Sequence, residues 1–328
     1  GCGKNNAAQH YESGWVAMEK KDYTTAVNEF QQVIDQNSRR AESYRAEGIA
    51  YYSEKAYPEA IAAFSRSLNN MDDPDKEFKK DVQFYLAQAR MDYGEVDKAI
   101  EVYSEILKAG EDEQAFFLRG KAYISMEDYK NAEKDFQRAL EGCEDYNLYI
   151  NIYQIYVDHN KAVDGDAYLK MALELEPQDG EDCYHRGRIY EYEKNYEAAR
   201  DELKTAMEQG YEDAMLLLGR VYLEMEDPAS ARSMYQEYLQ KSEQGAKAYN
   251  GLAMCDIYDG AYDSALENIA QGLKENSKED EQGLLYNEIV AYEYKRDFAT
   301  AKEKMKIYLE QYPEDEAALR ENEFLSTR

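Results

Sequence analysis

The sequence repeats one pattern of small residues at a period of about 34 residues. An anchor position of the pattern holds a small residue in nine successive copies, at Ala26, Ala60, Ala99, Ala132, Gly165, Ala199, Ala231, Ala265 and Ala301. The distance between neighbouring anchors lies between 32 and 39 residues. Self-similarity at a period of roughly 20–50 residues is typical of chains that stack copies of one structural unit. The sequence therefore predicts a repeat protein rather than a set of unrelated globular domains.

The clearest copy, residues 115–140, is typical of two short amphipathic helices joined by a tight turn. Phe116, Gly120 and Tyr123 are spaced to share one face of the first helix. Asp128 follows and is predicted to cap the second helix by accepting backbone N–H groups. The second helix carries its apolar stripe at Ala132, Phe136, Ala139 and Leu140. A lone hairpin cannot bury both stripes, so it needs copies of itself on either side.

Two further positions recur in most copies. The position twelve residues before the anchor holds Gly14, Gly48, Ala87, Gly120, Gly187, Gly219 and Ala253. The position that opens the second helix holds Tyr23, Tyr57, Tyr129, Tyr196, Tyr262 and Phe298. The period and these positions resemble the tetratricopeptide repeat. The resemblance implies an all-α fold, a right-handed α–α superhelix of about nine helix-turn-helix repeats with a C-terminal capping helix.

We therefore expect one elongated domain with short segments at its two ends. The nine repeats are predicted at residues 7–40, 41–74, 80–112, 113–145, 146–179, 180–211, 212–245, 246–278 and 282–313. Residues 1–6 would form a short N-terminal tether, and residues 314–328 the capping helix, apolar inward and polar outward. The repeat at 146–179 departs most from the pattern, because Tyr153 occupies a small position and Gly165 replaces alanine.

The charge of the chain restricts its partners. With 68 Asp and Glu residues against 39 Lys and Arg residues, the net charge is −29. This charge argues against binding nucleic acid, because phosphate groups would be repelled. It also argues against docking on an anionic lipid surface through protein charge. A partner with basic character would be steered toward the protein.

No catalytic or cofactor motif stands out in the sequence, which lacks GxSxG, P-loop, HExxH and CxxC patterns. Cys183 and His185 lie two residues apart, and such residues point to different sides of a helix, so we do not expect a metal site there. The repeats leave no residues for a catalytic domain. The sequence predicts a non-catalytic protein without a cofactor or metal.

The resemblance implies protein–protein binding, with the first helices of the repeats lining a concave groove for a peptide or a partner's helix. One groove position holds Lys121, Gln154, Arg188 and Arg220 in consecutive repeats, which predicts a mostly basic line. An apolar line of Phe117, Ile150, Tyr184 and Leu216 runs beside it, and Tyr192, Tyr258 and Tyr294 lie one turn further along. The candidate partner-binding residues are Lys121, Gln154, Arg188, Arg220, Phe117, Tyr184 and Tyr192.

The same residues allow a different interpretation, in which each cation only pairs with an acidic neighbour such as Glu191 or Glu224 and neutralises its charge. The lysine–asparagine pairing of the family's carboxylate clamp is absent, so the acidic C-terminal peptide that the clamp holds is not expected. The partner of the groove would be a peptide or protein of unknown identity.

The first residues, Gly1-Cys2-Gly3, resemble the processed start of a bacterial lipoprotein, in which the cysteine carries lipid. On this interpretation Cys2 anchors the protein on the extracytoplasmic side of the cell envelope. No other hydrophobic run is long enough to span a bilayer. The alternatives are an intracellular, cytoplasmic adaptor or regulator with an incidental cysteine, and an envelope-assembly factor. The preferred hypothesis is a lipid-anchored, non-catalytic interaction scaffold.

Overall fold

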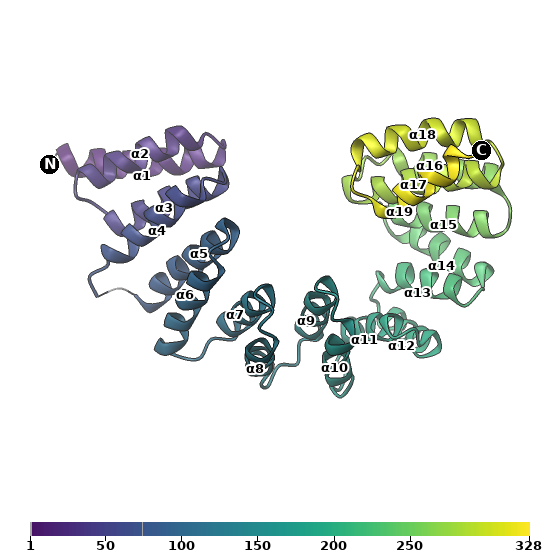
Figure 1. Cartoon of the computed structure of the whole chain (residues 1–328), viewed down its shortest axis with the longest axis horizontal. Coiled ribbons are helices and arrows are strands. Elements are labelled where there is room, and N and C mark those ends of the chain that lie inside the picture. Colours follow the sequence, from purple (N-terminus) through teal and green to yellow (C-terminus); the bar gives the residue numbers. More distant parts are fainter. Residues whose placement is uncertain (1, 74) are drawn as a thin grey trace. The chain divides into compact units, whose positions relative to one another are not determined.

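The computed structural model describes residues 2–73 and 75–328, and the side chains from Asn6 onward. This part of the chain folds into α-helices and contains no strand (Figure 1). The helices up to residue 173 are α1 (Cys2–Glu19), α2 (Tyr23–Asp35), α3 (Arg40–Ser53), α4 (Tyr57–Asn69), α5 (Lys76–Tyr93), α6 (Val96–Ala109), α7 (Glu113–Ser125), α8 (Tyr129–Ala139), α9 (Tyr146–Asp158) and α10 (Ala162–Leu173). The later helices are α11 (Gly180–Tyr192), α12 (Tyr196–Glu208), α13 (Ala214–Glu224), α14 (Pro228–Lys241), α15 (Ala246–Tyr258), α16 (Tyr262–Leu273), α17 (Lys278–Tyr294), α18 (Phe298–Gln311) and α19 (Glu316–Ser326). The prediction of an all-α repeat fold is confirmed.

Consecutive helices form hairpins, such as α3 with α4 and α11 with α12, and neighbouring hairpins within a unit pack on one another, for example α2 on α3 and α12 on α13. The turn inside a hairpin places one residue in the left-handed conformation, for example Lys55 (φ 61°) and Glu127 (φ 59°). After some of these turns the next helix begins with a capping side chain, as α8 does. Asp128 accepts a hydrogen bond of 3.2 Å from the backbone N–H of Asn131. This confirms the predicted cap.

The small residues of the first helices make room for large residues of the second helices. A Cβ atom added to Gly120 would lie 2.7 Å from the ring of Phe136, which is completely buried. Because that distance is far below van der Waals contact, only glycine lets the two helices approach this closely. The apolar faces predicted for the two helices of this repeat therefore meet at Gly120 and Phe136.

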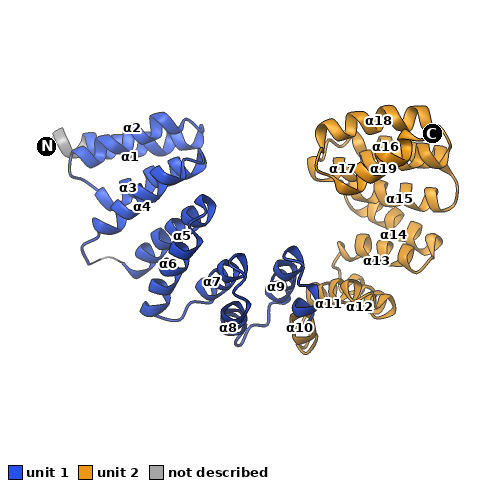
Figure 2. Cartoon of the chain, in the orientation of Figure 1, with its two compact units in different colours: residues 1–166 blue, residues 167–328 orange. Residues whose placement is uncertain are grey.

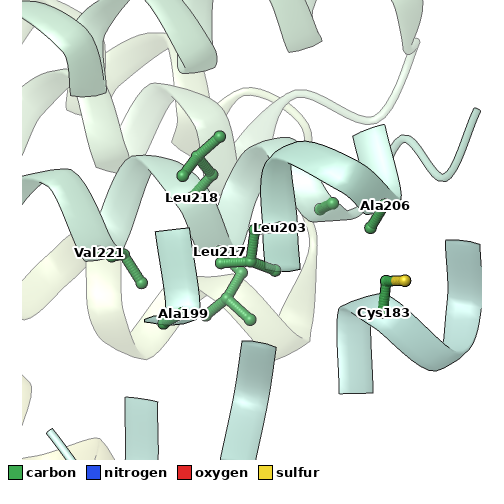
Figure 3. Packing of buried hydrophobic residues seen from close by; sticks show 8 residues of the cluster. Cys183, Ala199, Leu203, Ala206, Leu217, Leu218 and Val221 are labelled. Carbon is green, nitrogen blue, oxygen red and sulfur yellow. The ribbon is translucent and has the colours of Figure 1, made fainter. Parts of the chain in front are cut away.

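One buried cluster of the second half shows how neighbouring hairpins share a core (Figure 3). Side chains from α11, α12 and α13 meet there, with Leu203 of α12 beside Leu217 and Leu218 of α13. Leu203 and Leu218 are fully buried. A single hairpin could not exclude water from these groups, so the stacking of repeats supplies the hydrophobic stabilisation.

The chain divides into two compact units, unit 1 (residues 1–166) and unit 2 (residues 167–328), where the sequence predicted one elongated domain (Figure 2). The boundary lies within α10, in the repeat that departs most from the pattern. A Cβ atom on Gly165 would lie 2.8 Å from Cβ of Tyr156 and 3.2 Å from the ring of Tyr153. The glycine at this position therefore accommodates the bulky tyrosine that replaces a small residue in α9.

The two ends of the chain differ in part from expectation. Helix α1 begins at Cys2, inside the segment for which a tether was predicted. At the other end α19 packs on α18 and buries Ala318 and Leu325, as a capping helix should. Leu319 and Phe324, however, remain 44% and 39% exposed.

Candidate partner-binding cleft

The predicted groove residues divide between the two units. Unit 1 holds Phe117 and Lys121 on α7 and Gln154 on α9. Unit 2 holds Tyr184, Arg188 and Tyr192 on α11 and Arg220 on α13. The predicted line of four polar residues is therefore two pairs, one in each unit.

In unit 1 the two polar residues of the pair lie on helices that contact each other, α7 and α9. Lys121 is exposed. Gln154 is also exposed, and its Nε2 donates a hydrogen bond of 3.0 Å to Asp158 on the same helix. Phe117 is half-buried, with its ring 6.1 Å from that of Phe136. The aromatic residue thus contributes to the core as well as to the surface.

In unit 2 the pair is held by contacts of its own. Arg220 donates two hydrogen bonds, of 2.7 and 3.0 Å, to the carboxylate of Glu191 on α11. Arg188 lies 3.1 Å from Nδ1 of His185. The ion pair between Arg220 and Glu191, which the alternative interpretation expected, is therefore confirmed. Glu224, the other acidic neighbour, instead accepts a hydrogen bond from Tyr196 at 3.4 Å.

A cleft of about 940 Å³ lies within unit 2, and we call it the unit 2 cleft. Its wall is built mainly by the first helices of successive repeats, α11, α13, α15 and α17, which pack side by side (Figure 1). These helices contribute Tyr184, Leu216, Arg220, Lys247, Asn250 and Met254, among other residues. Of the predicted residues in unit 2, Tyr184 and Arg220 line the cleft, whereas Arg188 and Tyr192 are not among its lining residues.

Tyr235 of α14 is a buried residue in the lining of the cleft. Its ring lies against the backbones of Gly219 and Gly251, because a Cβ atom on Gly219 would lie 2.6 Å from it and one on Gly251 closer still. The side chain is only 4% exposed, and burial raises the pKa of its phenol. The ring of Tyr235 therefore packs between Gly219 of α13 and Gly251 of α15, and this packing fixes its position in the wall of the cleft.

Bonds between side chains tie the helices of the cleft together. The pair of Arg220 with Glu191 joins α13 to α11. The amide of Asn287 on α17 donates a hydrogen bond of 2.7 Å to Oδ1 of Asn250 on α15. Lys247 of α15 lies 3.2 Å from Glu279 of α17, and this hydrogen bond raises the pKa of Lys247. These contacts fix the positions of neighbouring cleft helices relative to each other.

The charge of the unit 2 cleft differs from the sequence prediction. Five carboxylates line it, from Asp213, Glu243, Glu275, Glu279 and Asp280. Only two cations line it, from Arg220 and Lys247. Of the predicted mostly basic line only Arg220 lines this cleft, whose other charged residues are mainly acidic. The prediction considered only positions inside the first helices, whereas the carboxylates come from the starts of α13 and α17 and from the loops before α15 and α17.

Metal and membrane sites do not emerge from the described part of the chain. Among its residues no group of three or more His, Cys, Asp or Glu side chains is placed to hold a metal ion. None of the described helices combines the length and apolar character that crossing a membrane requires. Cys143 is half-buried, Cys183 and Cys255 are buried, and all three are free thiols. The side chain of Cys2 lies outside the described residues, so lipid attachment stays a prediction.

Several solved structures are similar to this chain. The yeast Tom70 structure is 15% identical, with 94% of this chain and 85% of that chain covered and a TM-score of 0.51. A tetratricopeptide repeat protein from Parabacteroides merdae is 16% identical over 87% of this chain and 99% of that one, with a TM-score of 0.45. YrrB, described as a TPR protein with an unusual peptide-binding site, is 26% identical over 57% and 97%, with a TM-score of 0.38. At these identities and scores, only the similarity to Tom70 is informative, and it concerns the fold alone.

Family models give a more specific result. A model described as tetratricopeptide repeat matches residues 11–75, 184–246 and 216–281, and a second model with the same description matches residues 113–145. No curated protein sequence matches the chain. The matched ranges together exceed half of the chain and include residues of both units. The protein therefore belongs to the tetratricopeptide-repeat family.

Proposed function

We propose that the protein is a non-catalytic scaffold that holds an extended segment of a partner protein in the unit 2 cleft. The observation that carries this proposal is the cleft itself, whose volume of about 940 Å³ is lined by helices of four successive repeats. Ligand sites commonly have volumes of about 300–1,000 Å³ and combine apolar side chains with a few fixed polar groups. Tetratricopeptide repeats generally act as interaction scaffolds, which supports the same function.

The chemistry of the wall suits a polypeptide. Tyr184, Leu216 and Met254 offer apolar and aromatic contact area, and Asn250 offers an amide for hydrogen bonding. Met254 is 43% exposed, so its side chain is available to a partner. Aromatic residues and methionine are enriched where proteins bind one another.

The mechanism is presentation of a preformed surface. The ring of Tyr235 is fixed between two glycines. An ion pair joins α11 to α13, and an ion pair and a hydrogen bond between two side-chain amides join α15 to α17. A cleft whose side chains are already ordered loses less conformational entropy when a partner binds. Binding would then need little rearrangement of unit 2.

A photo-cross-linking experiment tests the site. We expect a photoreactive residue in place of Met254 to cross-link a partner in cells that produce the protein. Met126 is the matched control, because it is also an exposed methionine (52%) but lies at the end of α7 in unit 1. Equal cross-linking from both positions, or none from position 254, would contradict the proposal.

The proposed location is the extracytoplasmic side of a bacterial envelope, with lipid on Cys2. The Gly1-Cys2-Gly3 start supports this location. We expect the protein isolated from native membranes to carry a lipid mass on its N-terminal peptide, and Cys2→Ser to release the protein into the soluble fraction. An unmodified Cys2 in the native protein would instead favour the cytoplasmic adaptor.

A further inference from the structure

We infer that the unit 2 cleft recognises a partner segment in which lysine or arginine side chains flank an apolar residue. The inference rests on the proposed function and adds the chemistry of the ligand. It starts from the excess of carboxylates over cations in the lining of the cleft, five against two. The sign of this charge is opposite to the basic line that the sequence predicted.

Neither cation of the cleft is available to attract an acidic partner. Both nitrogens that Arg220 presents to Glu191 are hydrogen-bonded to its carboxylate, at 2.7 and 3.0 Å. Lys247 is paired with Glu279 at 3.2 Å. An acidic segment would have to break these pairs and also approach the remaining carboxylates. Like charges placed together in this way disfavour a wrong partner.

The remaining carboxylates of the cleft differ in whether they form hydrogen bonds within the protein. Glu275 accepts a hydrogen bond of 3.1 Å from the backbone N–H of Gly245. Asp280 accepts one of 2.7 Å from Ser277 and lies in the first turn of α17, where a negative charge is favourable. These two groups therefore have structural roles besides their place in the cleft.

Asp213 and Glu243 have no such role. Asp213 occupies the N-cap position of α13 in a helical conformation (φ −62°, ψ −19°), and its side chain makes no capping hydrogen bond. Other aspartates that precede helices, such as Asp128 and Asp227, do accept a backbone N–H. Glu243 lies in the loop between α14 and α15, and no ion pair or hydrogen bond of its carboxylate is found among the described residues. Both carboxylates face the cleft without a described partner.

The apolar part of the site lies among these charges. Tyr184, Leu216 and Met254 line the same cleft as Asp213 and Glu243. A segment with one apolar side chain between two cations could bury that side chain there and pair its charges with the carboxylates. The net charge of −29 would also steer such a segment toward the protein and speed association.

Peptide binding to the full-length protein tests the inference. The probes are three short fluorescent peptides of one backbone, which alternate leucine with a variable residue that is Lys, Gln or Glu. Fluorescence anisotropy would measure their dissociation constants. We expect the Lys peptide to bind tightest, and the double variant Asp213→Asn, Glu243→Gln to weaken its binding by about fivefold or more, with little effect on the Gln peptide.

Two controls make the result specific. The double variant Glu197→Gln, Glu208→Gln removes the same charge from exposed positions of α12 outside the cleft. If it weakens the Lys peptide as much as the cleft variant does, general attraction explains the binding and the inference is wrong. Met254→Ala should weaken all three peptides if the cleft is the binding site.

The outcomes separate the inference from the proposed function. If the Glu or Gln peptide binds as tightly as the Lys peptide and depends on Met254, the cleft is a binding site but its preference for cations is refuted. If no peptide depends on Met254 or on the two carboxylates, both the cleft function and the inference fail.

Discussion

At the residue scale, Glu47 is a buried carboxyl group without the charged partner on the paired helix that the equivalent residue of the fourth repeat has. It is only 3% exposed on α3, and its Oε1 makes no hydrogen bond. The equivalent position of the fourth repeat holds Arg119, which donates two hydrogen bonds of 2.8 Å to Asp135 on the paired helix. In the second repeat the position of that aspartate is taken by Ala63. Burial raises the pKa of Glu47 to about 7.

This burial predicts a pH dependence of stability. The pKa of Glu47 is raised from 4.5 to about 7 in the folded state, so the folded state binds the proton more tightly than the unfolded state. Stability should therefore fall as pH rises from about 4.5 to 7, with the full cost of the buried charge present above pH 7. We expect Glu47→Gln to flatten this dependence and to stabilise the protein at pH 8 by on the order of 1–3 kcal/mol.

The measurement is the urea midpoint of unfolding at several pH values. Glu42→Gln is the control, because Glu42 is an exposed glutamate of the same helix. A pH dependence that survives unchanged in Glu47→Gln would show that this carboxyl group is not its source.

At the scale of elements, two carboxyl groups come close together beside the last helix, α19. Glu293 of α17 and Glu321 of α19 line the same pocket. Burial, together with the hydrogen bond to Glu321, raises the pKa of Glu293 to about 8. Below this pH Glu293 is protonated, and Ala318 and Leu325 bury the apolar side of α19.

The raised pKa of Glu293 predicts that α19 loosens as pH rises toward 8. The pKa is raised above its ordinary value of 4.5, so the folded state binds this proton more tightly than the unfolded state, and stability falls between about pH 4.5 and 8. Once Glu293 is ionised it is repelled by the carboxylate of Glu321. We expect hydrogen exchange of the α19 backbone, corrected for intrinsic rates, to accelerate between about pH 5 and 8. Glu321→Gln should remove this effect and Glu323→Gln, an exposed position of α19, should not. An α19 equally protected throughout this range would contradict the prediction.

At the scale of the whole molecule, the acidic side chains repel one another. A net charge of −29 on a chain of 328 residues opposes the compact state. Salt screens exposed charges over about 10 Å at 0.1 M, so it should relieve this repulsion. We expect Tm to rise by a few degrees between about 0.05 and 0.5 M NaCl. A Tm that falls with salt would show that attractive surface pairs, such as Lys295 with Asp263, outweigh the repulsion.

A variant with fewer negative charges tests whether charge screening causes the response of Tm to salt. Replacing several exposed glutamates by glutamine, for example Glu197 and Glu208, lowers the repulsion directly. Such a variant should begin with a higher Tm at low salt and gain less from added NaCl. A gain equal to that of the parent protein would mean that salt acts through something other than charge screening.

The hairpins could be predicted from sequence because each one depends on residues close in the chain. Gly120 needs only Phe136, sixteen residues away, and Asp128 needs only the backbone of Asn131. The longest distance between anchors, from Ala60 to Ala99, is accommodated by α5, which extends over 18 residues. Such short-range rules recur in most repeats, which is why the period was sufficient to predict the fold class.

The candidate site depended on longer-range placement. The sequence predicted Tyr184 and Arg220 for the groove, and both line the unit 2 cleft. It also offered Glu191 as an acidic neighbour of the groove cations, and Glu191 does pair with Arg220, but it did not predict that Asp213 and Glu243 would line the same cleft. These carboxylates come from successive repeats, so no pattern within one repeat reveals their common position.

The sequence alone thus determined the repeating hairpin, because small and large residues within one repeat must fit each other wherever the hairpin is placed. Only the tertiary structure decided the sign of the charge in the cleft and the division into two units. The physical reason is that the charge of a surface is the sum over side chains that stacking brings together. The stacking of α11, α13, α15 and α17 gathers acidic residues from between the helices, as well as the basic residues on them.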